Sequence, residues 1–126
     1  PVLCDPWAGP DPSDPQHIRV ARRLELLLIA PASMNTIGRL AHGITEDVVT
    51  LTAAGIAPGT IPRILAPSMN AAMWIQPSTQ RNLKLLQDDG WLVVPPEEGM
   101  QACRTNGPGR LPEPESLLKV ISDHLA

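Results

Sequence analysis

Three short apolar runs stand out along the chain and predict buried strands. Leu26–Ala30 and Trp91–Val94 are continuously apolar, Ile61–Ala66 is largely so, and a proline follows each of them. Such runs are typical of parallel strands that are covered on both faces. The longest apolar run, Leu26–Ala32, is far too short to span a membrane.

Helical patterns occupy the segments between and after these runs. One begins at Gln16, and others cover residues 35–51 (with a break at Gly43), 79–88 and 115–125. Because strands that alternate with helices form a parallel sheet with helices packed against it, the sequence predicts an α/β layer fold. In such sheets ligands bind at the carboxyl ends of the strands, so functional residues are expected there.

The composition narrows the classes of function. The chain has 126 residues, a net charge of −3, three tryptophans and neither phenylalanine nor tyrosine, so the core is expected to be aliphatic. This charge gives no basic field for nucleic acid, which is therefore not an expected partner. Cys4 and Cys103 lack CxxC spacing, and no signal peptide is apparent, which favours the reducing cytoplasm. Residues 1–15 hold five prolines and three aspartates and predict a loop or arm.

Similar turns follow the first two predicted strands. Residues 30–35 (APASMN) and 66–70 (APSMN) each place serine and asparagine just past a strand end. Helix capping explains either turn alone, because serine and asparagine are preferred N-cap residues. Two copies at neighbouring strand ends favour a shared ligand instead.

Four motifs, in order, resemble those of the homo-oligomeric flavin-containing cysteine decarboxylases. Residues 31–36 resemble the PASANT motif of that family, residues 67–74 match its PxMNxxMW motif, and residues 102–114 are similar to its substrate-recognition clamp. His17 and Ile18 resemble the motif that carries the active-site histidine. The four motifs cover nearly the whole chain.

The resemblance implies a flavodoxin-like (Rossmann-like) domain, with helices on both faces of a parallel sheet. It also implies homotrimers or homododecamers that bind FMN between subunits. Family members begin with a βαβ segment whose Gly-Ser-rich loop helps to hold the FMN phosphate, and this chain shows no such loop. We therefore expect residues 1–126 to be the C-terminal part of one domain, with an arm over 1–15, an α/β core over 16–126 and the clamp within it at 99–114.

The implied reaction is oxidative decarboxylation of a cysteine. The carboxylate of cysteine cannot leave as CO2 until the CH2–SH group is oxidised to a thioaldehyde, which accepts the electron pair left on the α-carbon. The flavin takes the hydride in that oxidation. His17 is the candidate for proton handling, although a histidine at a helix start can simply face solvent. Asn35 suits the flavin edge or the substrate carboxylate, and Cys103 is the third catalytic candidate.

Further residues are predicted from the same motifs. The expected FMN-binding residues are Ser33, Met34, Asn35, Thr36 and Ser68. The expected substrate-binding residues are Met69, Asn70, Asn106 and Arg110, and no metal ligand is expected.

Two substrates and one non-catalytic role stay open. In the branch of the family that makes 4′-phosphopantetheine, the clamp cysteine is a proton donor, so Cys103 favours 4′-phospho-N-pantothenoylcysteine. Against this, Arg104 and Thr105 stand where that branch commonly has Gly-Asp, and Met34 replaces a small residue. The alternatives are decarboxylation of the C-terminal cysteine of a peptide to an aminoenethiol, and a regulatory flavoprotein without activity.

Overall fold

A three-stranded parallel sheet organises the chain. The computed structural model describes residues 2–5, 13, 15–101 and 103–125. The sheet has the order β1 (Leu27–Ala32), β2 (Arg63–Pro67) and β3 (Leu92–Val93), and both pairs of neighbouring strands are parallel. Each strand lies within or next to a predicted apolar run, so the prediction of a parallel sheet is confirmed.

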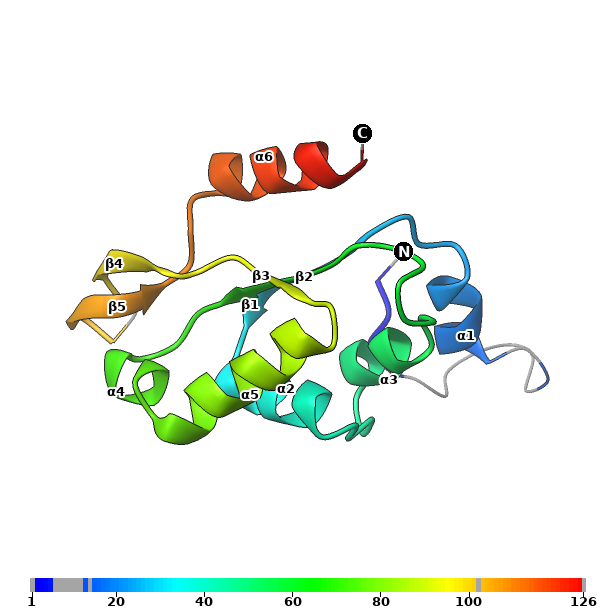
Figure 1. Cartoon of the computed structure of the whole chain (residues 1–126), viewed down its shortest axis with the longest axis horizontal. Coiled ribbons are helices and arrows are strands. Elements are labelled where there is room, and N and C mark those ends of the chain that lie inside the picture. Colours follow the sequence, from blue (N-terminus) through cyan, green and yellow to red (C-terminus); the bar gives the residue numbers. More distant parts are fainter. Residues whose placement is uncertain (1, 6–12, 14, 102, 126) are drawn as a thin grey trace.

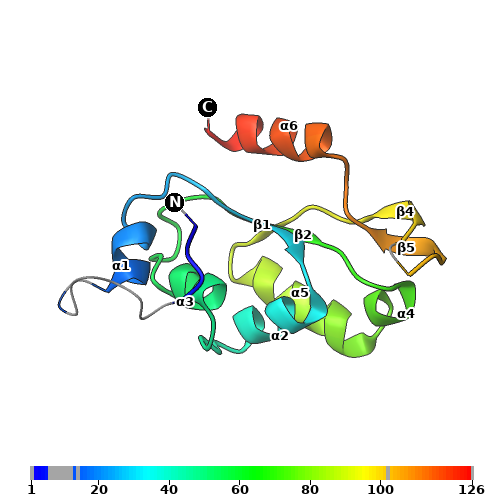
Figure 2. The ribbon, with the colours of Figure 1, turned by 180° about the vertical axis from the view of Figure 1, so that it is seen from behind.

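Helices lie on both sides of the sheet. Three of them, α2 (Met34–Ala41), α3 (Val48–Ala54) and α5 (Pro77–Asp88), lie on one side, and α6 (Pro114–Leu125) lies on the other (Figures 1 and 2). The short helix α1 (Gln16–Ala21) packs against α3 at one end of the molecule. This arrangement confirms the predicted α/β layers.

The core lies between the sheet and α2 and α5. Ile37, Leu65 and Leu86 are almost completely buried within it, and Trp91 at the start of the third predicted run is buried with them. Apart from this one indole the buried cluster consists of aliphatic side chains, as the composition predicts.

Proline does not stop β1, which corrects the prediction for that strand, whereas β2 ends at its proline as predicted. β1 continues through Pro31, after a cis Ala30–Pro31 peptide bond, and reaches Ala32; β2 ends on Pro67 itself. The pairing of β1 with β2 is irregular between Ile29 and Ala32. In the described sheet β1 is an edge strand with a partner on one side only, and an edge position tolerates a residue that has no N–H to donate.

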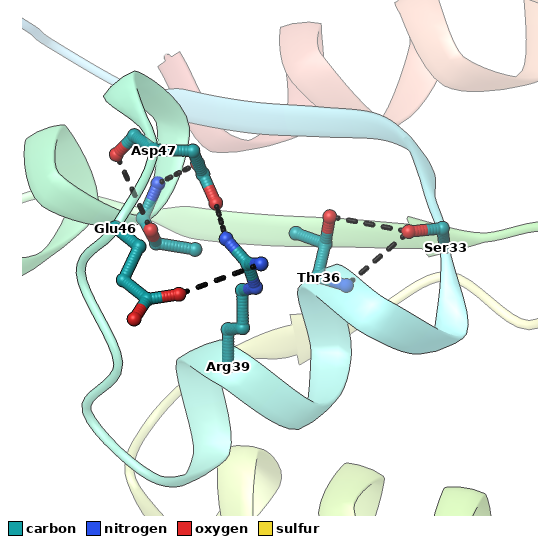
Figure 3. Close-up of polar contacts among 6 residues, drawn as sticks. Ser33, Thr36, Arg39, Glu46 and Asp47 are labelled. Carbon is teal, nitrogen blue, oxygen red and sulfur yellow. Dashed lines mark hydrogen bonds and ion pairs between the residues drawn. The ribbon is translucent and has the colours of Figure 1, made fainter. Parts of the chain in front are cut away.

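The predicted break at Gly43 is confirmed, because residues 35–51 belong to two helices. α2 ends at Ala41, and α3 begins only at Val48 because Asp47 caps it, with its carboxylate accepting from the Thr50 N–H at 2.9 Å. Burial by itself raises the pKa of Asp47, but the hydrogen bonds from Thr50 and Arg39 outweigh it and leave the pKa below its usual range. Arg39 reaches Asp47 at 3.0 Å and thereby joins the two helices (Figure 3).

Three elements were not predicted. These are the four-residue helix α4 (Ala71–Trp74) and the antiparallel hairpin of β4 (Glu97–Met100) and β5 (Asn106–Arg110). The hairpin forms within the segment assigned to the clamp, residues 99–114. Of the predicted arm, residues 1, 6–12 and 14 lie outside the described residues. Within the part of the chain that the structure describes, no helix combines the length and the apolar character needed to cross a membrane.

Candidate active site at the strand ends

The ends of β1 and β2 meet, as the two similar turns predict. The Ser68 N–H donates to the carbonyl oxygen of Ala32 at 3.1 Å, so the segments that follow the two strands start side by side. Ser33 caps α2: its hydroxyl oxygen accepts from the Thr36 N–H at 3.2 Å (Figure 3). Capping therefore accounts for Ser33. It does not account for Asn35, which is exposed in the first turn of the same helix.

Asn70 combines capping with a contact to the clamp. Its Oδ1 accepts from the Ala72 N–H at 2.8 Å and so begins α4. Its Nδ2 donates to Cys103 Sγ at 3.6 Å. Capping, one of the two explanations offered for the asparagines, is thus confirmed for Asn70, and the cap fixes the amide with its NH2 group toward the cysteine.

The hairpin docks on the turn after β2 through main-chain contacts. The Met69 N–H donates to the Gly109 carbonyl at 2.9 Å, and Gln101 Nε2 donates to the carbonyl oxygens of Met69 at 3.2 Å and Pro108 at 2.6 Å. Gly109 has φ +115°, and a Cβ there would lie 2.1 Å from the Met69 carbonyl oxygen. Glycine is required at this position because the two backbones approach too closely for any side chain.

A cavity of about 590 Å³ lies between the hairpin, the turn after β2 and the start of α6. Among the residues that line it are Ser68, Met69, Asn70, Cys103, Arg110 and Glu113. Five of these six were predicted as site residues from the sequence. Arg110 forms an ion pair with Glu113, so the predicted cation reaches the cavity already paired with a carboxylate.

Cys103 is exposed and held among hydrogen-bonding side chains. Its Sγ lies 2.8 Å from Thr105 Oγ1 and 3.6 Å from Gln101 Oε1, and the Thr105 hydroxyl also donates to Gln101 Oε1 at 3.2 Å. The Thr105 side chain, then its backbone N–H, then Asn70 stabilise the thiolate, so the pKa of the Cys103 thiol lies below its ordinary value. Sequence reasoning missed both Gln101 and Thr105 as site residues; the only signal was that Thr105 departs from the family pattern.

Apart from the predicted residues around the first turn of α2, two more do not join this cluster within one chain. His17 is buried in α1, which packs against α3 at the end of the molecule opposite α4 and the hairpin (Figure 1). Asn106 begins β5, pairs with Met100 and is exposed. The geometry of a single chain therefore joins Asn70 to Cys103 but leaves His17 far from both.

The residues around the first turn of α2 fit a phosphorylated or heteroaromatic cofactor. Ser33 and Asn35 are exposed there, and Met34 and Thr36 are partly buried. Free N–H groups at a helix start attract anions, and an asparagine amide pairs with the edge of a heterocycle through one donor and one acceptor. In the described structure no hydrogen bond engages the Asn35 amide, which leaves both of its functions available.

Comparison of the sequence with known proteins finds a matching family and similar proteins. The family model described as Flavoprotein matches residues 2–126. The coenzyme A biosynthesis bifunctional protein CoaBC of Bacillus subtilis (strain 168) is 39% identical over 125 residues, which are 99% of this chain and 30% of that protein. The chain thus spans less than a third of the length of this relative.

Two solved structures are similar over nearly the whole chain. A PPC decarboxylase mutant complexed with pantothenoylaminoethenethiol has a TM-score of 0.89 and 31% identity, and the match covers 95% of this chain and 68% of that one. SpaF, described as an FMN-dependent cysteine decarboxylase, has a TM-score of 0.80 and 33% identity, with 98% and 62% covered. These likenesses confirm the predicted flavodoxin-like fold.

Proposed function

Because the chain belongs to the Flavoprotein family, we propose that the protein is an FMN-dependent decarboxylase of cysteinyl carboxylates. The observation that carries the proposal is the contact of Asn70 Nδ2 with Cys103 Sγ at the wall of the 590 Å³ cavity. It places a thiol and a carboxamide donor together at the carboxyl ends of parallel strands. Two relatives named as decarboxylases, one of them FMN-dependent, support the proposal.

We assign the cofactor to the first turn of α2. Ser33, Met34, Asn35 and Thr36 surround this turn, and Ser68 lies beside it through its bond to Ala32. FMN, when bound, supplies the hydride acceptor that converts the CH2–SH group of the substrate into a thioaldehyde. Asn35 orients the ring edge through its amide, and Ser33 remains occupied with its cap.

The cavity residues position the substrate and handle its proton. Asn70 donates to the carboxylate or sulfur of the substrate cysteine, and Met69 provides an apolar wall that excludes water. After CO2 has left, the thiol of Cys103 donates its proton to the carbon that carried it, which leaves a thioaldehyde. For a saturated product, the hydride that FMN would have taken up returns to the thioaldehyde carbon. Arg110, at the end of β5, meets an anionic group at the far end of the substrate by exchanging its Glu113 partner for that group. Asn106, at the start of the same strand, is not among the residues that line this cavity.

His17 requires a second copy of the chain to act in this reaction. Within one chain α1 lies at the opposite end from Cys103, so His17 reaches a cavity only if another subunit brings it there (Figure 1). This requirement supports a homotrimer or homododecamer with shared sites. His17→Asn is expected to slow flavin reduction by substrate. His17→Asn subunits, which react slowly, are then mixed with Cys103→Ser subunits, which stop at the unsaturated product. Mixing is expected to restore rapid formation of the saturated product, and no recovery after exchange of subunits would contradict shared sites.

The substrate favoured here is 4′-phospho-N-pantothenoylcysteine, converted to 4′-phosphopantetheine. Cys103 lines the cavity with a thiol whose pKa lies below its ordinary value, and a saturated product needs a proton donor at that place. The name of the CoaBC relative points the same way. A peptide with a C-terminal cysteine is the alternative, because a reaction that stops at the aminoenethiol needs no such donor.

The mass of the product separates these substrates. The full-length protein, purified with its flavin, is incubated with phosphopantothenoylcysteine and separately with a peptide that ends in cysteine. Loss of about 44 mass units, one CO2, from the first supports the favoured reaction, and loss of about 46 from the peptide alone supports the alternative. Cys103→Ser should still release CO2 but accumulate the unsaturated product. If neither substrate is turned over while flavin is bound, the remaining interpretation is a regulatory flavoprotein without activity. For each of these functions we propose a cytoplasmic location.

A further inference from the structure

Three side chains surround the sulfur of Cys103, and one of them is locked in orientation. Gln101 uses both hydrogens of its amide on main-chain oxygens, because Nε2 donates to the carbonyls of Met69 and Pro108. Its Oε1 must therefore face the other way, toward Thr105 and Cys103. A fixed acceptor thus lies 3.6 Å from the thiol.

The hydroxyl group of Thr105, by contrast, can rotate. Its hydroxyl lies 3.2 Å from Gln101 Oε1 and 2.8 Å from Cys103 Sγ, so its single hydrogen can point to either atom. While the sulfur carries its proton, both the thiol and the hydroxyl donate to Gln101 Oε1. Once the sulfur is an anion, the hydroxyl turns to it as a charge-assisted donor.

We propose that Gln101 and Thr105 are positioning residues for Cys103, which hold the thiol in one orientation and stabilise the thiolate that remains after its proton is given up. This inference rests on the proposed function in one respect, the role of Cys103 as proton donor. The branch of the family that makes 4′-phosphopantetheine commonly has aspartate at the position of Thr105. In this chain the partner of the thiol is instead the neutral hydroxyl of Thr105.

The proton transfer balances with the groups present. The S–H bond of Cys103 breaks and its electron pair stays on the cysteine sulfur. The C=C π electrons of the substrate enethiolate form the new C–H bond while its sulfur forms a C=S bond, so the negative charge passes from the substrate to Cys103. Asn70 Nδ2 and the Thr105 hydroxyl then donate to the new thiolate. The lowered pKa of Cys103, caused first by the Thr105 side chain, agrees with this assignment.

A purely bracing role for Thr105 makes a different prediction. If the hydroxyl only tied the turn to Gln101, its removal would loosen the hairpin without changing the acidity of the thiol. The pH dependence of thiol alkylation distinguishes the two roles, because iodoacetamide reacts with the thiolate. It needs neither substrate nor turnover. Cys4, the other free cysteine, is exposed and provides an internal control in the same protein.

The test compares Thr105→Val, which has the same shape without the hydroxyl, with Thr105→Ser, which keeps it. In the full-length protein the alkylation of each cysteine is followed by peptide mass spectrometry from pH 5 to 10. Thr105→Val should move the midpoint for Cys103 to higher pH and slow its alkylation below that midpoint by about threefold to tenfold. Thr105→Ser should stay within about twofold of the parent protein, and Cys4 should not respond.

An unchanged Cys103 midpoint in Thr105→Val, or a serine variant that behaves like the valine variant, would overturn the inference. These outcomes differ from failure of the proposed function. If the parent protein releases CO2 while the midpoint does not move, the decarboxylase stands and the role of Thr105 falls. If the midpoint moves as expected but neither substrate is turned over, the role of Thr105 toward the thiol stands and the decarboxylase falls.

Discussion

Replacing Gly109 with alanine should detach the clamp hairpin from the turn after β2. Two costs arise at this position. A non-glycine residue at positive φ costs about 1–2 kcal/mol. In addition, the new Cβ would lie 2.1 Å from the Met69 carbonyl oxygen, so the backbones must separate and the bond from the Met69 N–H to the Gly109 carbonyl is lost. Loss of such a bond costs about 1–3 kcal/mol when its partners stay unsatisfied.

Gly59→Ala is the matched control. Gly59 also has a positive φ, +75°, but a Cβ there would meet nothing within 4 Å. It therefore carries the backbone cost without the close approach. The two variants should differ by about 1–3 kcal/mol, which is about a 5-fold to 150-fold change in a local opening equilibrium.

Hydrogen exchange measures that opening directly. In Gly109→Ala the Met69 amide should exchange at least fivefold faster than in the parent protein, by the lower end of that range. The Val94 amide, bonded to the Leu65 carbonyl at 2.8 Å within the sheet, should keep its rate. Gly59→Ala should leave the Met69 amide unchanged. Equal Met69 rates in Gly109→Ala and the parent protein would refute the account of how the hairpin docks.

Two further variants test the fold by urea unfolding. Leu86 is only 1% exposed, so Leu86→Ala should lower the free energy of unfolding by about 2–4 kcal/mol through lost burial and a new cavity. Its neighbour Leu85 is 39% exposed, so Leu85→Ala should lower it by less than about 1 kcal/mol. Equal losses would contradict the assigned core. Asp47→Ala should cost about 1 kcal/mol at pH 7 through loss of the α3 cap, and Asp47→Asn less because asparagine caps well. Because the folded pKa of Asp47 is depressed, its charge stabilises the protein above the unfolded pKa of about 3.9, and that stabilisation falls away as the pH drops through the folded pKa. Asp47→Asn should therefore flatten the acid dependence of stability, and an unaltered dependence would contradict the Arg39 and Thr50 contacts.

The sequence predicted those features that depend on local pattern. The strands were found because continuous apolar runs need burial on both faces, and the meeting of the two turns followed from their similar motifs at neighbouring strand ends. The hairpin escaped detection because residues 106–110 (NGPGR) contain none of the residues that favour strands. Its strand geometry comes from pairing with the nearby β4 and from docking on Met69, and the second of these contacts joins residues distant in sequence.

The sequence predicted only those site residues that lie in local motifs, and it did not predict the contacts between them. Asn70 and Cys103 each lie in a recognisable motif, but their contact depends on the docked hairpin. Gln101 lies outside the four motifs, and Thr105 departs from the pattern of its motif. The direction of the Gln101 amide, which brings both residues to Cys103, depends on the folded hairpin. The motifs grouped His17 with Cys103. Only the three-dimensional arrangement shows that α1, which carries His17, lies at the opposite end of the folded molecule from the hairpin.

The central claim is that the protein removes CO2 from a cysteinyl carboxylate with FMN as oxidant. The most direct measurement is release of labelled CO2 from phosphopantothenoylcysteine carrying carbon-13 in its carboxyl group. The full-length protein with FMN should release labelled CO2 in step with loss of substrate, and the same protein stripped of flavin should release none. Absence of labelled CO2 from this substrate and from a labelled peptide that ends in cysteine, with FMN demonstrably bound, would contradict the account.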